Sequence, residues 1–183
     1  MHDRPAAIRH LLPPILKLAT PADQFPPADP CLKLGDDVVA PFGHVTCVVG
    51  PGTKIMVFGF EAECDDAQLP PFYGATYAKQ VAACRAQLSG VTARFTVDGR
   101  AIPTVEATSP PEAITLPPKN INDVPPGPIT FAVDGLVALE HPLPPGTHTF
   151  DSHFEVCQPG GPPQSFDESF QVQVVPAPQA NGW

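Results

Sequence analysis

Proline sets the strongest limit on what this chain can fold into. It occupies 27 of the 183 positions, roughly three times its ordinary share, and much of it stands in adjacent pairs. The pairs occur at 13–14, 26–27, 70–71, 110–111, 117–118, 125–126, 144–145 and 162–163. Because proline lacks a backbone N–H and has a fixed φ, such pairs stand between strands and not within them. The spacing predicts short strands separated by stiff loops and leaves little room for long helices.

The longest nearly uninterrupted apolar run extends from Ile55 to Phe60, between Cys47 and Cys64. A glycine–proline turn precedes the run and acidic residues follow it, which is typical of a buried strand. From residue 91 onward the pattern is β throughout, and the Asp98-Gly99 pair is typical of a type I′ hairpin turn between 91–97 and 100–107.

Apolar and polar residues alternate clearly in the last two predicted strands. In 147–156 the apolar residues Phe150, Phe154 and Val156 share one face, while Asp151, His153 and Glu155 share the other. In 166–175 the inward set is Phe166, Phe170, Val172 and Val174. Such alternation indicates one buried and one solvated face, and therefore antiparallel sheets.

One helix is expected, near 76–88. Thr76 is a suitable N-cap, and Tyr77, Val81, Cys84 and Leu88 fall on one face of a helix that Gly90 would end. The fold class predicted is thus mainly β: an antiparallel two-sheet sandwich, jelly-roll or immunoglobulin-like, with this one short helix. We expect a Pro-rich N-terminal arm over 1–30, a single sandwich domain over 31–176 and a tail over 177–183.

The five cysteines, Cys31, Cys47, Cys64, Cys84 and Cys157, contain no CxxC motif, which argues against zinc-ribbon and thioredoxin folds. Pairing Cys31 with Cys47 and Cys64 with Cys84 would close loops of about 16 and 20 residues, each bond contributing roughly 3 kcal/mol. Cys157 would then be left over. The alternative is that all five are reduced core thiols of a cytosolic protein.

Charge excludes one class of partner. The net charge is −9, from 10 basic and 19 acidic residues, with no cluster of Lys or Arg; a nucleic acid partner is therefore not expected. No apolar run is long enough for a transmembrane segment. The only candidate targeting segment, 6–18, is interrupted by charge and proline. We therefore expect either a cytosolic chain or an exported one that lacks its leader here.

Several short motifs occur in an order that resembles an uncharacterised family of secreted, disulfide-containing bacterial β-sandwich proteins. The motifs are Cys47 with 51–54, Glu63-Cys64, 69–74, Ala83-Cys84, 96–99, 115–118 and 142–149. The resemblance implies an exported sandwich and supports both cysteine pairs. It also implies a secreted or cell-envelope location. It brings no catalytic residue, and this chain departs from the family at 135–137, at His153 and at Cys157.

An acidic cluster around Cys64 is the strongest candidate for chemistry. Glu61 and Glu63 point to one face of a strand, and Asp65 and Asp66 follow. Such oxygen ligands suit Ca²⁺, and paired carboxylates also serve glycosidases. A solvated strand end predicts the same residues without a ligand. The same holds for the stripe of Asp151, His153 and Glu155, whose residue types also suit a transition metal.

Two loop aromatics, Phe72 and Tyr73, are candidate ligand-binding residues, because aromatic rings on a rigid loop can contact a glycan or a protein. The alternative is that they pack beneath the loop as a small core. No GxSxG motif or phosphate-binding glycine loop occurs. The function expected is an exported, non-catalytic binding or structural protein of an envelope or assembly, with self-association through sheet edges as one route to assembly. The competing hypothesis is a metal-dependent or paired-carboxylate hydrolase that uses the acidic cluster.

Overall fold

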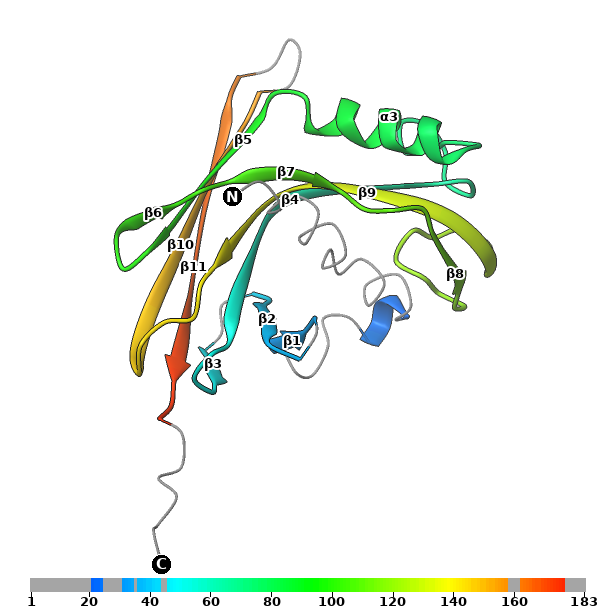
Figure 1. Ribbon diagram of the computed structural model, residues 1–183. Helices are drawn as coiled ribbons and strands as arrows, with labels where there is room; N and C mark the ends of the chain where they lie inside the picture. The colour runs from blue at the N-terminus through cyan, green and yellow to red at the C-terminus, as the bar shows by residue number, and fades with distance from the viewer. Residues whose placement is uncertain (1–20, 25–30, 35, 44–45, 158–161, 177–183) are drawn as a thin grey trace, which may run out of the picture. The chain divides into compact units, whose positions relative to one another are not determined.

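A computed structural model describes residues 21–24, 31–34, 36–43, 46–157 and 162–176. Within them the chain is mainly β, with one α-helix (Figure 1). The elements are η1 (Ala22–Gln24), β1 (Cys31–Lys33), β2 (Val38–Pro41), β3 (Thr46–Val49), β4 (Lys54–Asp65), α3 (Tyr77–Leu88), β5 (Val91–Val97), β6 (Arg100–Ile102), β7 (Val105–Thr108), β8 (Glu112–Leu116), β9 (Gly127–Glu140), β10 (Gly146–Val156) and β11 (Gln164–Val174). Apart from 21–24, the predicted arm over 1–30 lies outside the described residues, as does the tail over 177–183.

The strands form two sheets. One has the order β1-β2-β4-β9-β7, with β8 also paired to β9, and the other has the order β3-β11-β10-β5-β6. Both sheets are mixed, because β2 runs parallel to β4 and β3 runs parallel to β11. The prediction of antiparallel sheets was therefore wrong at these two pairs. Alternation along a strand determines which of its faces is buried, and it carries no information on the direction of the neighbouring strand.

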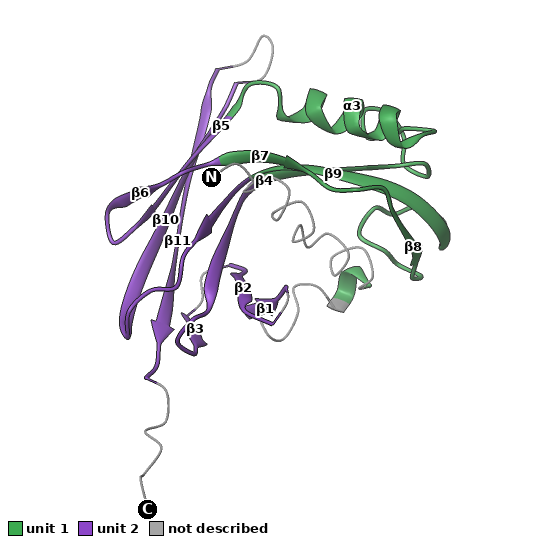
Figure 2. Cartoon of the chain, in the orientation of Figure 1, with its two compact units in different colours: residues 1–28, 60–91, 105–136 green, residues 29–59, 92–104, 137–183 purple. Residues whose placement is uncertain are grey.

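The chain divides into two compact units (Figure 2). Unit 1 comprises 1–28, 60–91 and 105–136, and unit 2 comprises 29–59, 92–104 and 137–183. The long strands β4 and β9 contribute residues to both. The single domain predicted over 31–176 therefore includes residues of both units.

The core of unit 2 is aromatic and aliphatic. Phe95 meets Phe154 edge to face, with ring centroids 6.1 Å apart, and Phe150 stacks on Phe170 at 5.0 Å. The alternation predicted for 147–156 is confirmed, since Phe150 and Phe154 are buried. The inward placement of Phe166 was wrong, because this residue is 49% exposed. Burial in β11 begins only near its C-terminal half, whereas the apolar pattern continues through the whole strand.

The hairpin turn at Asp98-Gly99 is confirmed. Both residues have positive φ, 50° and 77°, as a type I′ turn requires, and β5 pairs with β6 on either side. The strand predicted over 100–107 is instead divided: β6 ends at Ile102, and β7 belongs to the other sheet. Pro103 stands at the break, where its missing N–H ends the ladder.

In unit 1, α3 packs on β4 and β9. Its N-cap is Thr76, whose Oγ1 accepts a hydrogen bond from the N–H of Lys79 (3.4 Å). The predicted range is confirmed, and the predicted buried face is confirmed at Cys84 and Leu88 but wrong at Tyr77. Gln80, Cys84 and Leu88 are the buried residues, and Tyr77 is 37% exposed. A pattern of apolar residues cannot identify a buried glutamine, so the burial of Gln80 was not predicted.

Two disulfide bonds join Cys31 to Cys47 and Cys64 to Cys84, as predicted, and Cys157 is free and exposed. The first connects β1 to β3, and the second connects β4 to α3. Stable disulfides form in oxidising compartments, so the two bonds indicate such a location for this chain. None of the described helices has the length and apolarity of a membrane span.

Candidate functional site

The four acidic residues proposed as a calcium site lie at the end of β4, in unit 1. Glu61 and Glu63 are half-buried, Asp65 is fully buried and Asp66 is exposed. Asn122 donates from Nδ2 to Glu63 Oε1 (3.1 Å) and to Asp65 Oδ2 (3.2 Å), which brings these two carboxylates together. Among the residues that the structure describes, no three His, Cys, Asp or Glu side chains are grouped as metal ligands. The calcium site stays a prediction from the sequence.

Asp65 organises the chain that follows it. Its Oδ1 accepts hydrogen bonds from the N–H groups of Ala67 (2.8 Å) and Gln68 (2.6 Å), and its Oδ2 accepts from Gln68 Nε2 (3.1 Å). A short acidic side chain that binds the backbone two and three residues ahead stabilises a tight turn. The buried carboxylate therefore fixes the first residues of the loop.

Asp66 attaches the same segment to β9. Its Oδ1 accepts from the N–H of Thr130 (3.0 Å) and its Oδ2 accepts from Thr130 Oγ1 (2.8 Å). The N–H of Asp66 also donates to the carbonyl oxygen of Thr130 (3.3 Å). Both acidic residues thus serve as acceptors for groups of their own unit.

Residues 66–74, named the 66–74 loop below, connect β4 to the start of α3. Backbone hydrogen bonds of Asp65 close the base of this loop. The N–H of Asp65 donates to Phe72 O (3.1 Å), and the carbonyl oxygen of Asp65 accepts from the N–H of Gly74 (2.8 Å). Inside the loop, the N–H of Phe72 donates to Leu69 O (3.1 Å). Cys64, which forms a disulfide bond with Cys84 of α3, stands two residues before the loop. The backbone is therefore held at its start, in its middle and at its end.

The end of the loop lies directly on α3. A β-carbon placed on Gly74 would stand 2.8 Å from Gln80 Cγ, so only glycine fits this approach. Gln80 in turn donates from Nε2 to the carbonyl oxygen of Thr130 (2.8 Å). The buried glutamine thus connects the helix to β9 at the same point where the loop is seated.

Large apolar side chains project from this rigid backbone. Leu69 is 80% exposed, Tyr73 46% and Phe72 36%. Tyr77, in the first turn of α3, is 37% exposed, and its hydroxyl donates to Ser109 O (2.7 Å). The predicted residues Phe72 and Tyr73 are therefore partly exposed instead of packed in a core beneath the loop. Leu69 was missed, although its position directly before a proline pair is a signal for an exposed turn.

A second polar region lies on unit 2, where β5, β10 and β11 line a shallow open hollow. Its lining includes Arg94, Asp151, His153 and Asp167. His153 Nδ1 lies 2.7 Å from Asp167 Oδ1, and this hydrogen bond raises the pKa of the exposed imidazole. The alternating stripe predicted from the sequence faces solvent, and its histidine is paired with Asp167 of the neighbouring strand β11.

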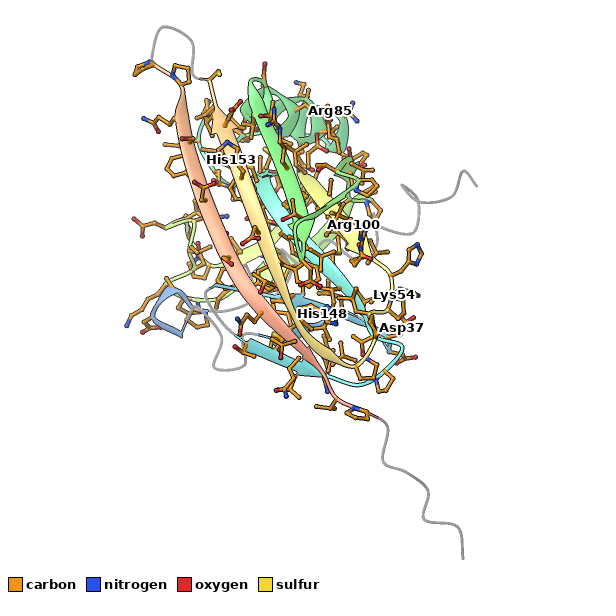
Figure 3. The ribbon with its side chains drawn as sticks, turned by 90° about the vertical axis from the view of Figure 1, so that its left-hand side faces the viewer. Asp37, Lys54, Arg85, Arg100, His148 and His153 are labelled. Atoms are coloured by element: carbon orange, nitrogen blue, oxygen red, sulfur yellow. A yellow bond between two sulfur atoms is a disulfide. The ribbon has the colours of Figure 1, made fainter. Side chains whose placement is uncertain are left out.

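Sequence patterns did not single out the buried carboxylate of Asp134 in β9. Its Oδ1 accepts from Thr108 Oγ1 (2.9 Å), and its Oδ2 lies 3.4 Å from Arg85 Nε. Arg85, labelled on α3 in Figure 3, is 3.8 Å from Glu106 as well. Burial raises the pKa of Asp134. The side chain joins α3 to β7 and β9, a structural role within unit 1.

Comparison with known proteins finds no matching family model and no matching curated protein. Among solved structures, a cysteine protease inhibitor, EhICP2, from Entamoeba histolytica aligns over 72% of this chain and 87% of its own, with 11% identity and a TM-score of 0.28. The solution structure of Amebosin aligns over 76% of this chain and 99% of its own, with 11% identity and a TM-score of 0.27. With TM-scores this low, neither structure defines the fold or the function of this chain.

Proposed function

We propose that this chain is a non-catalytic binding protein of an extracytoplasmic compartment, secreted or held at the cell envelope, and that it engages a protein partner through the 66–74 loop. One observation carries the proposal: a loop braced by hydrogen bonds, next to a disulfide, exposes Leu69, Phe72 and Tyr73. A preformed loop loses little conformational entropy on binding, so its apolar contacts contribute more fully to affinity.

The chemistry of the loop favours a protein over a glycan. Leu69 is the most exposed of the three side chains, and an aliphatic side chain has no flat face on which a sugar ring can stack. A projecting leucine beside two aromatic rings suits an apolar pocket on a protein surface, where buried aromatic anchors dominate binding energy. The partner expected is therefore a protein with a concave apolar site.

The acidic cluster supports the same function indirectly. A carboxylate that acts as acid, base or nucleophile must reach a substrate, whereas Asp65 is buried and binds four donors of its own unit. Its contacts give it a clear role in shaping the loop. The hydrolase hypothesis would need turnover that Glu61→Gln or Glu63→Gln abolishes.

Site-specific photo-crosslinking would test the proposal. A photoreactive residue at position 69 should crosslink one protein from the native extracellular or envelope fraction. The matched control carries it at Val48, which is 60% exposed on unit 2. The identified partner, purified, should bind the unmodified chain and lose at least tenfold in affinity with Leu69→Ser or Phe72→Ala. Equal crosslinking at both positions, or unchanged affinity of both variants, would refute the proposal.

A further inference from the structure

His148 is a buried histidine of β10 with an acceptor opposite each ring nitrogen. It is 8% exposed, and Figure 3 shows it on the same strand as His153. Nδ1 lies 2.7 Å from Asp98 Oδ2, and Nε2 lies 2.9 Å from the carbonyl oxygen of Pro144. A neutral imidazole carries one N–H, so one of these acceptors would then face a ring lone pair. Only the imidazolium donates to both.

The carboxylate of Asp98 is positioned independently of the histidine. Its Oδ1 accepts from the N–H of Thr149 (2.9 Å), and its own N–H donates to Thr149 O (2.8 Å). The positive φ of Asp98 holds it in the β5–β6 turn. The turn therefore presents a fixed negative group to His148, while the connection between β9 and β10 presents the Pro144 carbonyl from another side.

We propose that His148 is a pH-sensitive latch: as an imidazolium it holds the Asp98 turn and the Pro144 carbonyl against the start of β10, and this corner of unit 2 loosens when the ring loses its proton. Deprotonation leaves one acceptor facing a ring lone pair and removes the charge that strengthens the hydrogen bond to Asp98, so the buried ring holds its two partners less tightly. The three segments then lose the group that joins them.

The other charged groups of this corner come from the neighbouring strands. The positive charge of Arg100, in β6, helps to lower the pKa of Asp98. Arg100 also forms an ion pair with Glu140 at the end of β9 (2.9 Å). On β11 the residue in register with the latch is Val172, with a glutamine on each side. His141 belongs to the same connection as Pro144. Asp98 is the carboxylate in contact with the ring.

The direction of the pKa shifts defines when the latch is closed. The hydrogen bond to Asp98, followed by that to Pro144 O, raises the pKa of His148 above its ordinary 6.5. Its stabilisation is therefore complete below pH 6.5 and is lost as pH rises through the raised pKa. The pKa of Asp98 is lowered, mainly by His148, so its contribution is lost only as pH falls through that lowered value. The latch is therefore closed at pH values between the lowered pKa of Asp98 and the raised pKa of His148.

Nitrogen-15 NMR of the histidine rings in the full chain tests the proposal without any mutation. At pH 6.5, both ring nitrogens of His148 should have imidazolium shifts, and the midpoint should lie above 6.5. Above that midpoint, exchange of the Thr149 amide should accelerate at least tenfold after correction for the intrinsic rate. A neutral ring at pH 6.5, or Thr149 protection that does not follow the titration, overturns the proposal.

Asp98→Asn provides the matched variant. Asparagine tolerates the positive φ of the turn and keeps an oxygen for the Thr149 amide, so the change removes mainly the charge. The midpoint of His148 should fall by at least half a pH unit, while that of His153, which pairs with Asp167, should not move. An unchanged His148 midpoint in a folded variant contradicts the latch. If the variant does not fold, the titration of the unmodified chain decides.

Discussion

A β-carbon on Gly74 would stand 2.7 Å from the Cα of Gln80, closer than such atoms approach in folded proteins. Because Gly74 has no side chain, the end of the 66–74 loop can lie directly against the backbone of α3. The same glutamine bonds β9, so helix, sheet and loop meet at one pair of residues.

Gly74→Ala should reduce stability by about 1–3 kcal/mol, the usual effect of added volume in a packed site. The extra methyl group meets backbone atoms of Gln80, which cannot move without shifting the helix. Urea unfolding measures the change. Gly50→Ala is the control, since no atom lies within 4 Å of its added carbon. Equal stability of the two variants would show that the loop is not seated as described.

Gln80→Ala should cost about 0.5–1.5 kcal/mol, because the carbonyl oxygen of Thr130 loses the amide donor of Gln80 and keeps the N–H of Asp66. Exchange of the amides at Phe72 and Gly74 should also become faster, since the loop rests on this side chain. Thermal unfolding and hydrogen exchange together provide the measurement. Gln87→Ala, on a half-buried position of the same helix, should change stability by less than about 0.5 kcal/mol. A Gln80 variant as stable as this control would contradict the role of the bond.

Arg85→Ala should destabilise the chain by about 1–3 kcal/mol at pH 7, because the buried carboxylate of Asp134 loses its cation. Burial raises the pKa of Asp134 above its ordinary 3.8, so ionisation reduces stability as pH rises through the raised pKa. The effect of removing Arg85 should accordingly shrink at acidic pH.

Two backgrounds check this expectation. In an Asp134→Asn chain, Arg85→Ala should have little effect, since no buried charge remains. Arg94→Ala, which removes an exposed arginine of unit 2, should be near neutral in both backgrounds. A cost for Arg85→Ala that persists unchanged at low pH and in the Asp134→Asn chain would show that its role does not depend on the charge of Asp134.

The thiol count should be one in the unfolded, unreduced chain, from Cys157, and five after reduction. Replacing both Cys64 and Cys84 by Ala should cost about 3 kcal/mol for a bond that spans 20 residues. Titration with a thiol reagent and urea unfolding measure the two quantities. Five reactive thiols before reduction would exclude both bonds and with them the oxidising location.

Local signals predicted local structure well. The helix range followed from the Thr76 cap, the tight turn followed from Asp98-Gly99, and both disulfides joined cysteines close in sequence. The burial of Cys84 and Leu88 in α3 was predicted as well, but that of Gln80 was not. Gln80 is buried because a carbonyl of β9, 50 residues away, lies opposite its amide, and no periodicity of apolar residues contains that partner.

The sequence by itself determined that this chain is mainly β, because paired prolines and alternating side chains act within a few residues of one another. Tertiary structure alone decided strand direction, the burial of Asp134 and the two acceptors around His148. Each of these depends on which groups the folded chain brings together, and most of those groups are distant in sequence. The exposure of Leu69, Phe72 and Tyr73 has the same origin, since the bonds of Asp65, Asp66 and Gly74 hold their loop away from the core.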